Sequence, residues 1–213
     1  MAGTTDVIFS EAISHLQAGR TREAEKALRR LLRRTSDHPL ALSVLGAILV
    51  GTGKFEEAER YLQSALKLNP NAHVALYNHG IALKALKRPD ESLAQFTKAL
   101  AINPDDVETL SNRGTVYNDL KNHEAALADF DKAIAAAPNY ALAHYNRGNA
   151  LSGLARTDDA LAAYQRAVTL LPELAEGWNA IGLSLEKLER HDEAKTAFET
   201  ARQRALARGQ HQS

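Results

Sequence analysis

Three asparagine residues recur at an interval of 34 residues, at Asn78, Asn112 and Asn146. A carboxamide carries two N–H donors and one acceptor oxygen, so it can pair with the N–H and the C=O of a peptide backbone whatever side chains the peptide has. One such group per structural unit could hold an extended peptide along its length. The alternative is that these asparagines satisfy neighbouring polar groups between helices.

Six further residues lie close to this asparagine column at helical steps. One residue before the column position stand Tyr77, Tyr145 and Asn179, three residues after it stands Asn149, and six residues after it stand Lys84 and Asn118. A tyrosine ring supplies apolar contact together with a polar tip. With the three asparagines, these side chains form a candidate peptide-binding surface of nine residues, which we call the polar strip.

The patterns that mark catalysis or metal binding are missing from the sequence. It contains no cysteine, which removes thiolate catalysis and cysteine metal clusters. His73 and His79 are six residues apart and belong to different faces of a helix, and no two histidines have the i, i+4 spacing of a helical metal site. Phosphate-binding glycine loops and a G-x-S-x-G turn do not occur either. We therefore expect no metal ion, no cofactor and no enzymatic activity.

The interval of 34 residues also runs through positions that carry no chemistry. Three registers of small residues and proline keep it: Gly46, Gly80, Gly114, Gly148 and Gly182; Pro70, Pro104, Pro138 and Pro172; Ala24, Ala58, Ser92, Ala126, Ala160 and Ala194. Glycine inside a helix costs about 1 kcal/mol relative to alanine, so the repeated glycine implies that two helices approach too closely there for a side chain. A period of this size predicts stacked units that bury their apolar faces against one another.

Residues 107–140 show what one unit contains. Apolar residues at helical spacing predict a helix from about Val107 to Leu120, and a polar break follows at 121–123. A second apolar set at helical spacing ends before Pro138. The unit is therefore expected to be two antiparallel helices joined by a short turn.

Length and charge agree with a chain built wholly from such units. The units account for residues 5–208 of the 213, which leaves a short polar tail at 209–213 and no room for a second domain. Lys and Arg number 26, as do Asp and Glu, so the chain lacks the strong positive field that nucleic-acid or membrane binding usually needs. No apolar run approaches the ~18 residues of a membrane span. We expect a soluble, cytoplasmic protein that binds neither nucleic acids nor membranes.

With these residues in view, the chain resembles the tetratricopeptide repeat (TPR) family, whose unit has an aromatic residue or Leu, then Leu-Gly, Tyr, Ala, Phe, Ala and Pro in that order. The resemblance covers six units: 5–38, 39–72, 73–106, 107–140, 141–174 and 175–208. It departs at the ends, where Ser36 and Leu206 replace the proline, and Trp178 is expected to have a packing role. The resemblance implies an all-α fold, a right-handed α-solenoid of antiparallel helix pairs whose first helices line a concave groove.

The resemblance also bears on the ligand. The asparagine column is similar to the asparagine ladder in the repeat region of O-linked N-acetylglucosamine transferases. The carboxylate clamp that some TPR proteins use for chaperone C-termini needs early lysines that this chain lacks, so we do not expect it. The positions in question hold Phe9, Ser43, Tyr77, Ser111, Tyr145 and Asn179. Arg113 and Arg147 are expected to pair with carboxylates such as Asp129 or Asp131 instead of an acidic ligand.

Two groups of charged residues stand near the ends of the array. In the sixth unit, Lys195, Arg202 and Arg204 replace residues that are apolar in inner units, which predicts a solvent-facing cap that completes the array. In the first unit, five basic residues share one face of the second helix: Lys26, Arg29, Arg30, Arg33 and Arg34. This basic stripe could attract an acidic partner or phosphate. The alternative is a solvated face whose last turn complements the negative helix terminus.

These observations lead to three hypotheses about function. The first is a non-enzymatic scaffold or adaptor that binds an extended segment of a protein partner in its concave groove. The second is the repeat region, or a stand-alone relative, of a TPR-containing glycosyltransferase, because the run from His15 to Leu32 resembles the first repeat of bacterial proteins that join such arrays to glycosyltransferase regions. The third is a self-assembling structural module, in which case the partner is a second copy of the chain and the protein is a homo-oligomer.

Overall fold

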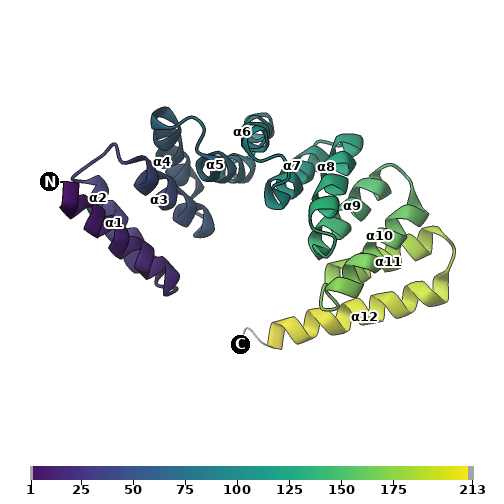
Figure 1. Ribbon diagram of the computed structural model, residues 1–213. Helices are drawn as coiled ribbons and strands as arrows, with labels where there is room; N and C mark the ends of the chain where they lie inside the picture. Colours follow the sequence, from purple (N-terminus) through teal and green to yellow (C-terminus); the bar gives the residue numbers. More distant parts are fainter. Residues whose placement is uncertain (1, 211–213) are drawn as a thin grey trace. The chain divides into compact units, whose positions relative to one another are not determined.

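The computed structural model describes residues 2–210, and these residues form twelve α-helices and no strand (Figure 1). The helices are α1 (Ala2–Gln17), α2 (Thr21–Leu32), α3 (Pro39–Gly51), α4 (Phe55–Leu68), α5 (His73–Ala85), α6 (Pro89–Ile102), α7 (Val107–Asp119), α8 (His123–Ala136), α9 (Ala141–Gly153), α10 (Thr157–Leu170), α11 (Ala175–Lys187) and α12 (His191–Gln210). Each of the six predicted units contains two of them. The predicted all-α fold of helix pairs is confirmed.

The chain divides into two compact units. Unit 1 ends at Pro104 and contains α1 to α6, and unit 2 begins at Asp105 and contains α7 to α12. Within each unit, the two helices of a pair pack against each other, and the second helix packs against the first helix of the next pair. This consecutive packing of helix pairs is the arrangement of an α-solenoid.

The repeated glycine marks the contact between the two helices of a pair. A Cβ atom built on Gly80 would lie 2.6 Å from Cε1 of Phe96, and one built on Gly148 would lie 2.5 Å from Cε1 of Tyr164. Carbon atoms in van der Waals contact are about 3.5–4.0 Å apart. The ring of Phe96 is fully buried, so it has no free space into which to move. The steric reason predicted for the glycines is confirmed, and the atoms they admit are side-chain atoms of the second helix.

The features expected at the end of the array are also present. Lys195, Arg202 and Arg204 are exposed. Trp178 packs against the core of unit 2, and its Nε1 donates a hydrogen bond to the carbonyl oxygen of Pro172 at 2.9 Å, so its packing role is confirmed. Helix α12 continues to Gln210, two residues into the segment expected to be a tail, and residues 211–213 lie outside the described part of the chain.

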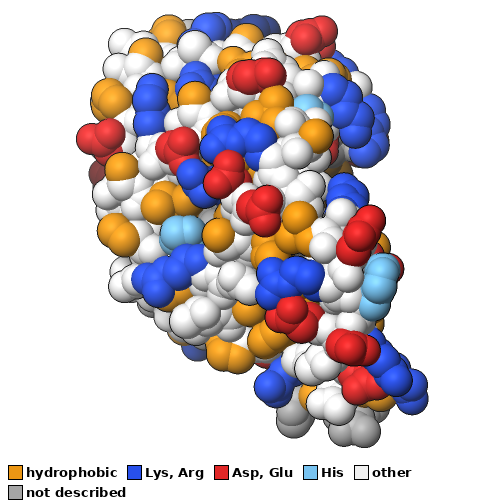
Figure 2. Space-filling view, turned by 90° about the vertical axis from the view of Figure 1, so that its right-hand side faces the viewer, with side chains coloured by type: hydrophobic (Ala, Val, Ile, Leu, Met, Phe, Trp, Pro, Cys, Tyr) orange, Lys and Arg blue, Asp and Glu red, His pale blue; other side chains and the backbone are white. Residues whose placement is uncertain are grey.

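The surface agrees with the even charge of the sequence. On the face of the molecule in Figure 2, Lys and Arg side chains are interspersed with Asp and Glu, and hydrophobic side chains lie singly or in small groups between them. None of the helices in the described chain combines the length and apolar composition of a membrane span.

One core position holds a titratable group. His79 is only 6% exposed. The equivalent positions carry Leu45 and Ile181 in the second and sixth repeats, and the charged residues Glu11, Arg113 and Arg147 in the other three. Burial lowers the pKa of His79 below its ordinary value of 6.5, although the carboxylate of Glu59 opposes the shift. The unfolded chain therefore binds a proton first as the pH falls below about 6.5, and the folded state loses stability in that range.

Replacing Gly80 by Ala should lower the free energy of unfolding by about 1–3 kcal/mol, because the added methyl group overpacks the Phe96 ring. This cost exceeds the ~1 kcal/mol that alanine contributes to helix propensity. Gly51 offers a matched control, because a Cβ atom there meets nothing within 4 Å, and Gly51→Ala should keep or raise stability. Urea unfolding followed by circular dichroism measures both, and a Gly80→Ala protein as stable as the wild type would contradict the steric explanation.

Replacing His79 by Leu, the residue at the same position of the second repeat, should flatten the dependence of stability on pH. Between pH 7.5 and 5.5 the wild-type free energy of unfolding should fall as His79 resists protonation in the core, and the variant should lose that component. Urea titrations at several pH values test this. Equal slopes for the two proteins would show that His79 does not contribute.

Candidate functional site

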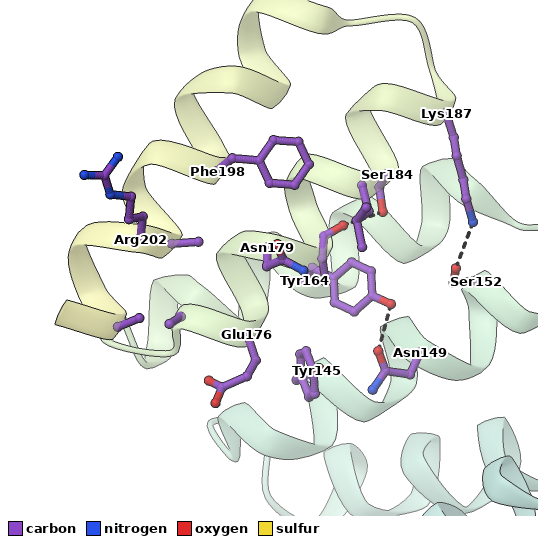
Figure 3. A pocket seen from close by; sticks show the side chains of 15 residues that line it. Tyr145, Asn149, Ser152, Tyr164, Glu176, Asn179, Ser184, Lys187, Phe198 and Arg202 are labelled. Carbon is purple, nitrogen blue, oxygen red and sulfur yellow. Dashed lines mark hydrogen bonds between the residues drawn. The ribbon is translucent and has the colours of Figure 1, made fainter. Parts of the chain in front are cut away.

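The nine residues of the polar strip divide between the two units. Helix α5 of unit 1 carries Tyr77, Asn78 and Lys84; α7, α9 and α11 of unit 2 carry Asn112, Asn118, Tyr145, Asn146, Asn149 and Asn179. Three of them, Tyr145, Asn149 and Asn179, line one cavity of about 720 Å³ in unit 2 (Figure 3). Helices α9, α10, α11 and α12 supply its walls, so the last two repeats build it together.

A hydrogen bond and a ring contact hold one wall of this cavity. The Tyr164 hydroxyl donates to Oδ1 of Asn149 at 2.9 Å, and the rings of Tyr164 and Tyr145 lie 5.8 Å apart between centroids. Burial raises the pKa of Tyr164 to about 12, so the hydroxyl remains a donor at neutral pH. The bond fixes the carboxamide of Asn149 and leaves its Nδ2 for another acceptor.

The lining of the cavity also carries charged groups and hydroxyl groups. Lys187 Nζ donates to Ser152 Oγ at 3.5 Å, and the labelled side chains of Lys187 and Arg202 stand on separate helices beside the cavity (Figure 3). Ser184 Oγ instead donates to the carbonyl oxygen of Ala180 within α11 at 2.9 Å. Lys187 and Arg202 are the cations of the lining, and Glu176 adds one carboxylate.

A second cavity, of about 790 Å³, is more apolar. Leu142, Leu171 and Leu174 line it, and so do Tyr145 and Asn146 of the polar strip. Tyr145 also lines the first cavity, so the two adjoin at its ring. The C-terminal turns of α12 form one wall. Charged residues line the second cavity beside its leucines: Glu173, Glu176, Arg204 and Arg208.

Other members of the polar strip bond within their own helices or turns. Nδ2 of Asn78 donates to the carbonyl oxygen of Val74 at 2.8 Å, and Nδ2 of Asn112 donates to that of Glu108 at 3.0 Å. Both bonds lie within the residue's own helix, whereas the alternative expected bonds between helices.

Three further members of the polar strip lie away from these cavities. Oδ1 of Asn118 lies 2.7 Å from Nδ1 of His123 across the turn between α7 and α8. The ring of Tyr77 lies 6.2 Å from that of Phe96, and Lys84 is half-buried on the same helix as Tyr77. None of these three residues lines the two cavities described above.

The sequence reasoning missed several lining residues. Lys187 follows Asn179 by two steps of four residues, a spacing that could have added it to the same helix face. Arg202 was assigned only to the cap, yet it lines the first cavity, as does Phe198. They come from second helices, which the groove model of the family had set aside.

Arg113 and Arg147 pair with acidic residues, as predicted. Arg113 forms two hydrogen bonds with Asp129, Nε to Oδ2 at 2.8 Å and Nη2 to Oδ1 at 2.7 Å, and Asp129 is 3% exposed. Nε of Arg147 donates to Oδ1 of Asp131 at 2.6 Å in a more exposed pair. The hydrogen bonds that Arg113 donates to Asp129 raise the pKa of Arg113. Both arginines therefore belong to the scaffold.

The two pairs make a stability test. Replacing Arg113 by Ala should cost about 3–5 kcal/mol, because it leaves a buried carboxylate without its partner. Replacing Arg147 by Ala should cost at most about 1 kcal/mol, because water screens the exposed pair. Urea unfolding of the two variants at pH 7 measures the difference, and equal losses would show that burial of Asp129 has no energetic consequence.

Comparison of the sequence with family models identifies the class of protein. A model described as a tetratricopeptide repeat matches residues 9–73, 45–107 and 145–207, and a second model with the same description matches residues 105–173. Together these matches span nearly all of the helical array. The chain belongs to the tetratricopeptide repeat family. No curated protein matches the chain in sequence.

Solved structures of similar fold are TPR proteins as well. MamA of Desulfovibrio magneticus RS-1 is 27% identical, with a TM-score of 0.73 over 79% of this chain and 96% of that chain. PilW, a type IV pilus biogenesis factor, is 20% identical, with a TM-score of 0.81 over 91% and 90% of the two chains. YrrB, described as a TPR protein with an unusual peptide-binding site, is 20% identical, with a TM-score of 0.69 over 84% and 93%.

Proposed function

We propose that this protein is a non-enzymatic scaffold or adaptor that binds an extended segment of a partner protein along its first helices. Membership of the TPR family supports an interaction module in general. The fold resembles that of YrrB, whose description includes a peptide-binding site, and this likeness supports a peptide as the ligand. The even balance of charge favours a protein partner over a nucleic acid.

The cavity lined by Tyr145, Asn149 and Asn179 is the observation that carries this proposal. An extended peptide presents N–H and C=O groups along its length and needs both donors and acceptors opposite them. The Nδ2 of Asn149 and the exposed carboxamide of Asn179 supply such groups. The apolar recess beyond Tyr145 accepts a side chain of the same segment.

The two amides have different roles in the test. Asn149→Ala also removes the acceptor of the Tyr164 hydroxyl, which costs about 1 kcal/mol of stability. Asn179 is exposed, so Asn179→Arg blocks the cavity with a large side chain and leaves the core intact. Asn103, exposed at the end of α6 in unit 1, provides the control substitution Asn103→Ala.

Affinity capture from native cell extract, quantified by mass spectrometry, tests the proposal. Two cavity variants are compared with the wild type: Asn149→Ala with Asn179→Ala, and Asn179→Arg alone. Each should capture at least tenfold less of the partner that the wild type enriches. Asn103→Ala should retain it, and circular dichroism should show equal helicity in all four proteins. Undiminished capture of the partner by both cavity variants would contradict the proposal.

The same experiment separates the other hypotheses. Enrichment of the chain itself, with a concentration-dependent dimer in sedimentation that Asn179→Arg abolishes, would favour self-assembly instead. Enrichment of a glycosyltransferase by the wild type and by both cavity variants would favour the second hypothesis, in which the chain accompanies an enzyme.

A further inference from the structure

A hollow of about 350 Å³ lies between α2 and α4 in unit 1, apart from the polar strip. Its lining includes Arg33, Ser36, Leu32, Leu42, Arg60 and Tyr61. Leu32 and Leu42 are buried and form an apolar floor, whereas Arg33 and Arg60 are exposed. The hollow collects cationic and hydroxyl groups from two successive repeats, and the peptide-binding proposal uses none of them.

A third arginine at this hollow, Arg29, is held by carboxylates. Its Nη1 and Nη2 donate to Glu57 at 2.6 and 2.9 Å, and Nη2 also donates to Oε1 of Glu25 at 2.8 Å. Lys54 Nζ donates to the same Glu25 oxygen at 3.0 Å. The charges of two cations and two carboxylates cancel within this group. The hydrogen bonds that Arg29 donates to Glu57 raise the pKa of Arg29.

The charges of Arg33 and Arg60 are not cancelled in this way. Neither forms an ion pair with another residue of the described chain. They add two positive charges to a hollow whose other charged group is neutralised. An anion that enters it therefore meets arginines, whose planar guanidinium groups match the oxygens of a phosphoryl group.

The hydroxyl of Tyr61 completes the set of donors. Its oxygen lies 3.5 Å from Nη1 of Arg29, which donates to it. The hydroxyl hydrogen of Tyr61 is therefore left to be donated to a ligand. Ser36 adds a second hydroxyl at a position where four of the other repeats have proline.

An internal comparison shows that the scaffold does not require these groups. The same place between α8 and α10, three repeats later, has Ala135 for Arg33, Ala162 for Arg60 and Ala163 for Tyr61. Arg33 is the C-cap residue of α2, where a cation is favourable in any case. Arg60 lies within α4, away from either end, so no helix terminus accounts for it.

We propose that this hollow binds a phosphoryl group, with Arg33 and Arg60 as cationic ligands and Tyr61 and Ser36 as hydroxyl donors. Two sources have this chemistry, a phosphorylated side chain of a partner protein and a free phosphate compound. The apolar floor of Leu32 and Leu42 suits the ring of a phosphotyrosine. Arginine clusters are a recurring means of recognising phosphorylated segments.

Isothermal titration of the full chain with inorganic phosphate, O-phospho-L-serine and O-phospho-L-tyrosine tests this proposal, at an ionic strength held constant with chloride. Saturable binding of at least one probe is expected. Arg33→Gln and Arg60→Gln should each weaken it at least tenfold. Arg34→Gln is the matched control, because Arg34 is exposed on the same stripe but does not line the hollow, and it should bind like the wild type.

The comparison of probes identifies the source. Tighter binding of phosphotyrosine than of inorganic phosphate supports a phosphorylated side chain, and equal binding supports a free phosphate compound. Absence of saturable binding by all three probes would overturn the proposal. So would wild-type affinity in the Arg33→Gln, Arg60→Gln double variant when circular dichroism shows it folded.

Discussion

The close contact between the two helices of each repeat is the constraint on which the rest of the structure depends. A glycine in the first helix admits a large side chain of the second, as at Gly80 with Phe96 and Gly148 with Tyr164. A Cβ atom at either glycine would lie within 2.6 Å of the ring, whereas the first repeat has Ala12 at this position. Because the contact recurs every 34 residues, each repeat presents the same positions to its neighbours and to solvent. The contact restricts the residue at the glycine position, whereas the residues that face neighbours and solvent are free to differ between repeats.

The two units use that freedom differently. In unit 1 the second helices carry a cationic hollow. In unit 2 the first helices supply Asn149 and Asn179 to a polar cavity. One scaffold therefore carries two surfaces of different chemistry, and the registers of glycine, alanine and proline are common to both.

Residue patterns predicted the scaffold closely, because steric and periodic constraints are local. The helix expected from about Val107 to Leu120 is observed as Val107–Asp119. The cavities could not be predicted in the same way, since they depend on how side chains from second helices meet the first helices. Spacing places Asn78 and Asn149 on one strip, but it cannot show that Asn78 bonds to its own helix while Tyr164 fixes Asn149. The extension of α12 to Gln210 could have been predicted, because Leu206 replaces the proline that ends the inner repeats.

The basic stripe shows why a single helix is the wrong unit for finding sites in a repeat protein. In the sequence the arginines of the stripe look equivalent, yet packing separates them. Arg29 donates hydrogen bonds to Glu57 of the next repeat, whereas Arg33 lines a hollow together with Arg60 of that repeat. A helix face decides only which side chains share a surface. Whether their charges cancel or accumulate is decided by the neighbouring repeat, so binding chemistry in such a chain is a property of the junction between repeats.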